Sequence, residues 1–191
     1  GKVHILKMME GQIVTEDVQE EVGYTEEKGR KVFKPDGTYQ KIAAVERHKN
    51  TGKIGVGIVK GFGLRGGAIA SSVSHDSHNL IVIGDNDHDM YLAVQELLRT
   101  QGGYTLVENG QVFDTLPLPI MGLMSDAGYE KVNEKLARMI SKAHEMGIPE
   151  GFDPFITLSF MALPVIPEIR ITPRGVYLTQ EDRMIQSPFD R

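Results

Sequence analysis

The sequence predicts an α+β fold, with a largely antiparallel or mixed sheet covered by helices. Three observations indicate this class. Short apolar runs typical of strands recur along the chain, several of them are joined by tight turns, and two segments carry the apolar spacing of a helix. The 191 residues are 40% hydrophobic and 25% charged, which is enough to bury a core in one domain with at most a small appendage.

Composition divides the chain into four parts. Residues 1–22 predict two short strands, at residues 3–8 and 12–22. Residues 23–38 are dense in charge and glycine, so we expect a linker or mobile loop there. Residues 39–178 form the main α+β domain, and residues 179–191 predict a polar tail. Because the chain begins with Gly1 rather than Met, we expect it to be a fragment.

The first half of the main domain predicts four strands and a helix. Residues 42–47 and 54–59 are apolar runs around a turn with Asn and Gly, which predicts a hairpin. Residues 68–73 and 80–83 predict two further strands. A helix follows, with Asp87 as its candidate N-cap and Gly102-Gly103 as its end. Its apolar stripe has helical spacing and consists of Met90, Ala93, Val94, Leu97 and Leu98.

The second half predicts a hairpin, a helix and extended segments. Asn109-Gly110 between two apolar runs is a strong hairpin signal. A second helix is expected after a Ser125-Asp126 cap and ends at Gly147. We expect residues 155–163, 168–171 and 176–178 to be extended. The buried stripe of the second helix is expected to be Val132, Leu136, Met139, Ile140 and Ala143.

The pentapeptide His75-Asp76-Ser77-His78-Asn79 is the main candidate for a functional site. It lies between two predicted strands, so the loop is held at both ends and can present polar side chains to a ligand. Imidazole and carboxylate groups can move protons or coordinate metals, which favours a site. A solvated turn would have the same composition, and that alternative stays open.

Other polar motifs have structural explanations. Residues 61–66 fit the pattern G-x-G-x-x-G, but a strand follows rather than a helix, so we reject nucleotide binding in favour of a sharp turn. The acidic residues and His88 at positions 85–89 match a helix start better than a metal cluster. We expect His48 to be solvated in a turn and His144 to lie at the C-terminal end of a helix.

Composition also narrows the classes of function. A net charge of −5 provides no electrostatic footprint for nucleic acid. No apolar run approaches the ~20 residues needed to span a membrane, and no signal peptide is apparent. The absence of cysteine excludes disulfides and thiolate metal sites, and it fits a cytoplasmic location. Small-molecule chemistry or protein contact is therefore expected, without a nucleic-acid or membrane partner.

Several segments closely resemble the C-terminal region of bacterial adenine deaminases. They are residues 45–48, 61–70, 74–79, 116–125 and 154–167, in the same order. Residues 11–15 resemble part of that family's small β-rich domain, which follows its catalytic barrel. The resemblance covers residues 2–178 and implies that residues 1–22 are a short β segment of this neighbouring domain.

The resemblance implies a part in the metal-dependent conversion of adenine and water to hypoxanthine and ammonia. In the amidohydrolase superfamily, a metal-bound hydroxide attacks the purine carbon that bears the amine. The divalent metal, Mn or Fe, is expected in a barrel of ~250 residues that this shorter chain lacks. The chain alone is therefore expected to bind no metal and to be inactive. The implied partners are the catalytic barrel domain, adenine and further copies in a homo-oligomer.

Under this interpretation the pentapeptide faces the mouth of the barrel and completes the purine pocket. His75, Asp76 and His78 are the candidate catalytic residues, for a proton relay or a hydrogen bond to a metal ligand. Ser77 and Asn79 are the candidate substrate-binding residues.

Three alternatives stay open. The same five residues could instead fix an interdomain interface. His75, Asp76 and His78 could hold the metal of a stand-alone hydrolase, though only with unusual geometry for so short a loop. The chain could also be a non-catalytic interdomain or oligomerisation module that docks through residues 116–124 and 155–167.

Overall fold

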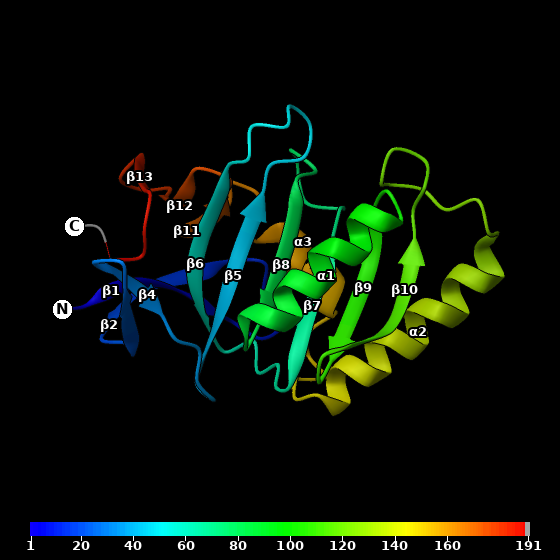
Figure 1. Ribbon diagram of the computed structural model, residues 1–191, viewed down its shortest axis with the longest axis horizontal. Helices are drawn as coiled ribbons and strands as arrows, with labels where there is room; N and C mark the ends of the chain where they lie inside the picture. Colours follow the sequence, from blue (N-terminus) through cyan, green and yellow to red (C-terminus); the bar gives the residue numbers. More distant parts are fainter. Residues whose placement is uncertain (190–191) are drawn as a thin grey trace.

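The computed structural model describes residues 1–189 and confirms the α+β class. An eight-stranded sheet in the order β10-β9-β7-β8-β5-β6-β1-β2 forms its centre (Figure 1). All its pairings are antiparallel except the parallel contact of β1 with β6. Its strands are β1 (Val3–Met8), β2 (Thr15–Glu20), β5 (Tyr39–Val45), β6 (Ile54–Lys60), β7 (Gly67–Ser71), β8 (Leu80–Gly84), β9 (Gly103–Glu108) and β10 (Gln111–Pro117).

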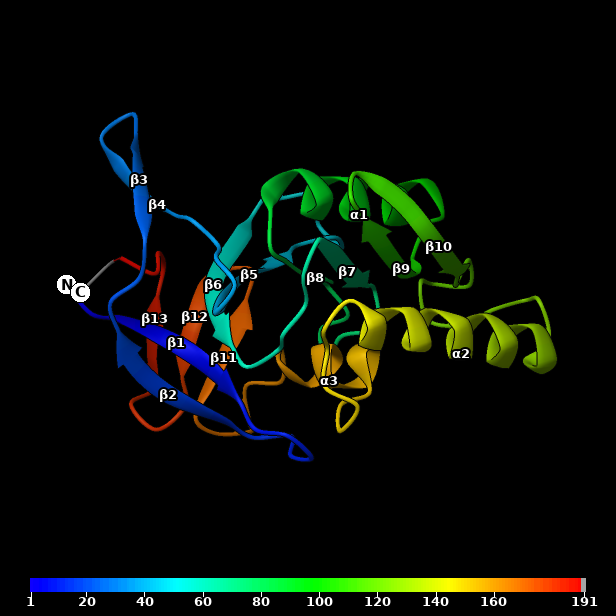
Figure 2. The same cartoon turned by 90° about the horizontal axis from the view of Figure 1, so that it is seen from below.

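Helices cover both faces of this sheet. Helix α1 (Asp87–Arg99) lies on one face, and α2 (Tyr129–Glu145) and α3 (Pro154–Phe160) lie on the other (Figure 2). A three-stranded sheet of β11 (Ile169–Thr172), β12 (Gly175–Leu178) and β13 (Arg183–Ile185) packs against β5 and β6. In the described part of the chain, no helix has the length and apolar character needed to cross a membrane.

Two segments are more ordered than composition predicts. The expected linker, residues 23–38, contains a hairpin of β3 (Tyr24–Glu27), which is exposed, and β4 (Arg30–Phe33), which buries Phe33. Within the expected tail, residues 179–191, β13 pairs with β12 and buries Ile185, while residues 190–191 lie outside the described residues. The predicted domain boundaries stay a prediction, although the N-terminal strands join the main sheet.

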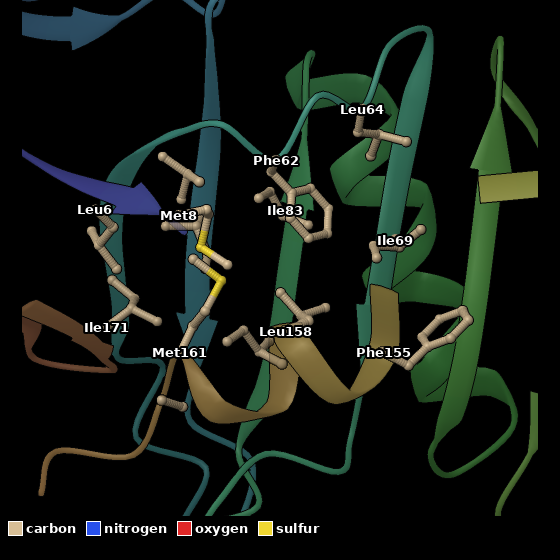
Figure 3. Packing of buried hydrophobic residues seen from close by; sticks show 14 of the residues in the cluster. Leu6, Met8, Phe62, Leu64, Ile69, Ile83, Phe155, Leu158, Met161 and Ile171 are labelled. Carbon is tan, nitrogen blue, oxygen red and sulfur yellow. The ribbon is translucent and has the colours of Figure 1, made fainter. Parts of the chain in front are cut away.

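The main core fills the space between the sheet and the layer of α2, α3 and the small sheet. Phe62 and Ile69 come from the sheet side, and Phe155 and Leu158 reach them from α3 (Figure 3). A second cluster packs α1 onto the opposite face. The loop before β7 is built on glycines with positive φ at 61, 63 and 66, as a sharp turn between strands requires.

Both long helices form as predicted, but their caps differ. The N-cap of α1 is Asn86 rather than Asp87, because the Asn86 side chain accepts the Asp89 N–H. Helix α2 begins later than the expected Ser125-Asp126 cap, with Gly128 at its N-cap and no side-chain bond there. Of the five residues expected in the buried stripe of α2, only two are fully buried, and the other three pack half-buried against the core. The buried pair is Met139 and Ala143.

The prediction of an extended segment at residues 155–163 is wrong, because residues 154–160 form α3. Asp153 is its N-cap and accepts the N–H groups of Phe155 and Ile156 at 3.0 and 2.9 Å. Pro154 occupies the first turn, where its missing N–H costs nothing. The short helix buries Phe155 and Leu158 under β7 and β8, beside the pentapeptide, whereas Ile156 is exposed.

Candidate functional site

The pentapeptide forms the connection from β7 to β8 and is anchored to α3. The His75 N–H donates to the Ser159 carbonyl at 3.1 Å, and the His75 ring lies 4.9 Å from the Phe160 ring. The His78 N–H donates to the Ser74 carbonyl at 2.7 Å, which closes the loop into a tight turn. Backbone bonds and ring packing therefore fix the loop before any ligand is considered.

The structure brings the two histidines of the loop together. Their ring centroids are 6.0 Å apart, with the planes inclined by 60°. Burial lowers the pKa of His78, and the nearby positive groups His75 and Arg47 lower it further. In the described chain, the buried Nδ1 of His78 has no hydrogen-bond partner. The lowered pKa favours the neutral form of the His78 imidazole, and a neutral imidazole can accept a proton.

The remaining loop residues differ in exposure. Asp76 and Ser77 are exposed, whereas Asn79 is buried. Asn79 donates from Nδ2 to the Ser77 hydroxyl at 3.1 Å, and its Oδ1 accepts the Arg47 backbone N–H at 3.3 Å. Within residues 1–189, the Asp76 carboxylate has no hydrogen bond or ion pair. The loop therefore offers a free carboxylate next to an oriented amide.

A cavity of about 380 Å³ adjoins this loop. Its polar lining comes mainly from the loop, from Ser74, Asp76, Ser77 and Asn79. Its other walls are Ala44, Ala162, Pro164, Ile171, Thr172 and Pro173. The Ser74 hydroxyl is buried and has no partner in the described chain. The volume falls in the range of small-molecule pockets, and mostly apolar walls with a few polar groups are their usual lining.

Two contributors to the site are missed by the sequence prediction. His48 is exposed, as expected, but its Nε2 also donates to the Ser77 carbonyl at 2.6 Å. Arg47 donates from Nε to the His78 carbonyl at 2.5 Å. The signal for both is strand pairing: β5 runs antiparallel to β8 with Val45 opposite Leu80, so the residues after β5 lie beside the end of the pentapeptide.

The acidic cluster at residues 85–89 is structural, as expected. Asp85 accepts the N–H groups of Gly66 and Gly67, and Asp87 pairs with Lys41. Asp89 is 3% exposed and bonds to the Asn86 side chain and the Gly110 N–H. The His88 side chain is 69% exposed, and its Nδ1 lies 3.4 Å from Asp89 Oδ1.

The loop residues do not fit a metal centre. Within residues 1–189, no group of three or more His, Asp or Glu side chains is placed to hold a metal ion. The other expected helix-end residue, His144, donates from Nδ1 to the Ile148 carbonyl at 2.9 Å, just beyond α2. Of the described histidines, His48 and His144 hydrogen-bond to backbone carbonyl groups.

Comparison with known proteins identifies the family. Residues 12–183 match the family described as adenine deaminase C-terminal domain. Adenine deaminase of Desulfitobacterium hafniense (strain Y51) is 53% identical over 182 residues, which are 95% of this chain and 31% of that protein. Adenine deaminase of Bacillus subtilis (strain 168) is 43% identical over 178 residues, 92% of this chain and 30% of that protein.

A third relative gives the same result. Adenine deaminase of Nitratidesulfovibrio vulgaris (strain DP4) is 55% identical over 146 residues, 76% of this chain and 25% of that protein. The chain thus spans about a third or less of the length of these curated relatives. Since the family match runs through nearly all of the sequence, the chain belongs to the adenine deaminase C-terminal domain family.

Proposed function

We propose that this chain is the C-terminal portion of an adenine deaminase, the enzyme that converts adenine and water to hypoxanthine and ammonia. In this proposal the pentapeptide completes or caps an active site whose catalytic barrel lies elsewhere in the polypeptide. The observation that carries the proposal is the 53% identity, along 95% of the chain, to a protein named adenine deaminase that is about three times longer. The chain alone is expected to be inactive.

The loop provides chemistry suited to this role. His78, whose lowered pKa favours the neutral imidazole, can accept a proton, and His75 and Asp76 lie beside it to pass the proton on. Adenine presents an amine donor and ring-nitrogen acceptors. The Asp76 carboxylate and the Asn79 and Ser77 side chains line the cavity and provide matching acceptors and donors. The roles of these five residues are part of the proposal.

The metal belongs to the barrel in this proposal. A divalent ion, Mn or Fe, would supply the activated water when bound there. The described side chains, in residues 1–189, are not arranged to hold it, so their proposed role is to orient the purine and move protons. A cytoplasmic location also belongs to the proposal.

A second candidate is a non-catalytic interdomain or oligomerisation module. It is favoured by large apolar side chains that are exposed after β10, on α3 and after α3. They are Ile120, Met121, Met124, Tyr129, Ile156 and Val165. Single exposed apolar residues are ordinary, but several close together in sequence suit a docking surface. In this case the pentapeptide would stabilise an interface and would have no part in catalysis.

Activity of the isolated chain tests the proposal. The chain is incubated with adenine and with Mn²⁺, Fe²⁺ or Zn²⁺, and hypoxanthine is measured together with ammonia. We expect no product, whereas the polypeptide that joins this chain to its catalytic part forms both in equal amounts. Measuring hypoxanthine controls for ammonia released by side reactions. Metal-dependent hypoxanthine formation by the chain alone would overturn the division of labour proposed here.

A further inference from the structure

We propose that Arg47 is a positioning residue, which holds the pentapeptide and the connection after β10 in one fixed arrangement. The part of this connection that matters here is residues 118–124, which we call the 118–124 segment. The inference rests on the proposed function, because it assigns Arg47 the task of orienting a loop that is proposed to act in catalysis.

Hydrogen bonds from Arg47 reach both loops at once. Its Nε donates to the His78 carbonyl at 2.5 Å, and its Nη2 donates to the Met121 carbonyl at 2.7 Å. Its backbone N–H donates to Asn79 Oδ1 at 3.3 Å. One side chain therefore joins the end of β5 to two loops that are 31 and 74 residues away in sequence. A planar guanidinium can reach two carbonyls in a fixed geometry, and a lysine ammonium has no such fork.

The surroundings of Arg47 are unusual for a cation whose only role is stability. In the described chain it forms no ion pair with a carboxylate. Burial lowers its pKa. A partly buried charge held only by carbonyls carries a desolvation penalty without the gain of an ion pair. What the structure shows in return for this desolvation penalty is that Arg47 holds the two loops in a fixed position.

Gly122 provides the space for this arrangement. Its φ is +75°, and a Cβ added there would lie 2.6 Å from Nη1 and 2.8 Å from Nη2 of Arg47. The guanidinium thus lies directly against the backbone of the 118–124 segment. Any other residue at this position must either move the guanidinium or shift the segment.

Hydrogen bonds of Ser72 connect the 118–124 segment to the other end of the pentapeptide. The Ser72 hydroxyl donates to the Gly122 carbonyl at 2.6 Å, and it accepts the Gly103 N–H at 2.8 Å. Ser72 precedes the pentapeptide and Arg47 bonds its fourth residue, so the 118–124 segment is connected to both ends of the loop. The position of the His78 ring therefore depends on contacts made by residues outside the pentapeptide.

The test compares Arg47→Lys, Arg47→Gln and Gly122→Ala in the polypeptide that contains the catalytic part. We expect kcat to fall about tenfold or more with a smaller change in KM, since a displacement of about 1 Å can cost as much as 10²-fold. Gly122→Ala keeps the charge of Arg47 but displaces its guanidinium, so this variant should show the same fall in kcat. Arg99→Gln is the control, because Arg99 is exposed on α1 and pairs only with Glu96.

The pH profile adds a readout that scaffolding alone would not change. The charged or titratable groups facing His78 are His75, Arg47, Asp76 and His48. Removing the positive charge in Arg47→Gln should raise the pKa of His78, and the acid limb of kcat/KM should move to higher pH. Arg47→Lys keeps the charge and should leave this limb nearly in place while kcat falls.

An activity-independent arm separates this inference from the proposed function. Amide signals of the 191-residue chain are followed by NMR in the same variants. We expect Gly122→Ala and Arg47→Lys to shift signals of residues 75–79 as well as those of the 118–124 segment, and Arg99→Gln to shift neither. If the pentapeptide signals stay unchanged, or kcat stays within twofold while only the melting temperature falls, Arg47 is not a positioning residue. A wild-type polypeptide without deaminase activity would overturn the proposed function and leave the NMR result to decide this one.

Discussion

Replacing Asn86 by alanine should destabilise the chain by about 2 to 3 kcal/mol. Asn86 Oδ1 accepts the Asp89 N–H at 2.8 Å, which is the N-cap bond of α1. Its Nδ2 donates to Asp85 Oδ1 and to Asp89 Oδ2, both at 2.9 Å. One side chain thus satisfies a helix terminus and bonds two carboxylates.

The magnitude follows from these contacts. Loss of an N-cap side chain typically costs about 1 kcal/mol. Hydrogen bonds to charged groups contribute about 1.5 to 3 kcal/mol, and Asp89 is 3% exposed, so water cannot easily replace the lost donor. Asp89 keeps the Gly110 N–H at 2.9 Å, which limits the total.

Urea unfolding of the 191-residue chain measures the effect. The free energy of unfolding is compared for the wild type, Asn86→Ala and the control His88→Ala. Because the His88 side chain is 69% exposed and its contact with Asp89 is long, at 3.4 Å, the control should stay within about 0.5 kcal/mol of the wild type. An Asn86→Ala chain as stable as the control would refute the cap assignment and the reasoning from Asp89 burial.

Two further predictions concern packing and pH. Gly55→Ala should destabilise the chain by about 1 to 3 kcal/mol or more, because the added Cβ would lie 1.8 Å from the Thr172 carbonyl oxygen. Gly37→Ala is the control and should be near neutral, because a Cβ there would have no atom within 4 Å. The melting temperatures of the two variants test this prediction. Since the pKa of His78 is lowered in the folded chain, the unfolded chain takes up the proton first, and stability should fall as the pH drops below about 6.5. Urea midpoints between pH 7.5 and 5 should fall less steeply for His78→Asn, and equal slopes would contradict the lowered pKa.

Local signals predict most elements of this fold. Asn109 and Gly110 both have positive φ, as the turn between β9 and β10 requires, and the helical stripe of α1 identifies that helix. The error at α3 has a local cause, since a continuous apolar run fits a buried strand and a buried helix equally well. The Asp153-Pro154 pair was the available signal for a helix start.

The hairpin within residues 23–38 also lacks a local signal. Every residue of β3 is exposed and Phe33 is the one buried residue of β4, so no apolar alternation marks these two strands. Lys28 and Gly29, both with positive φ, form the turn that allows the hairpin.

Long-range contacts are the part that could not be predicted from the sequence. The pentapeptide itself stands out because its residue types are reactive, but its partners come from elsewhere in the chain. His48 and Arg47 reach it through the pairing of β5 with β8, and Ser159 and Phe160 reach it from α3. No spacing rule within a single segment encodes these approaches, because they depend on the order of strands in the sheet.

The most direct test of the central claim is turnover in the polypeptide that joins this chain to its catalytic part, measured for His75→Ala and His78→Ala with His88→Ala as the control. A side chain that transfers a proton is typically worth about 10²-fold to 10⁴-fold, so kcat should fall by at least about 10²-fold in the two loop variants and stay near normal in the control. The melting temperature of His75→Ala should fall modestly, because this variant loses the ring packing against Phe160, but this loss does not account for a 10²-fold fall in kcat. Near-normal kcat with a lowered melting temperature in both loop variants would contradict a catalytic role and identify the pentapeptide as part of an interface.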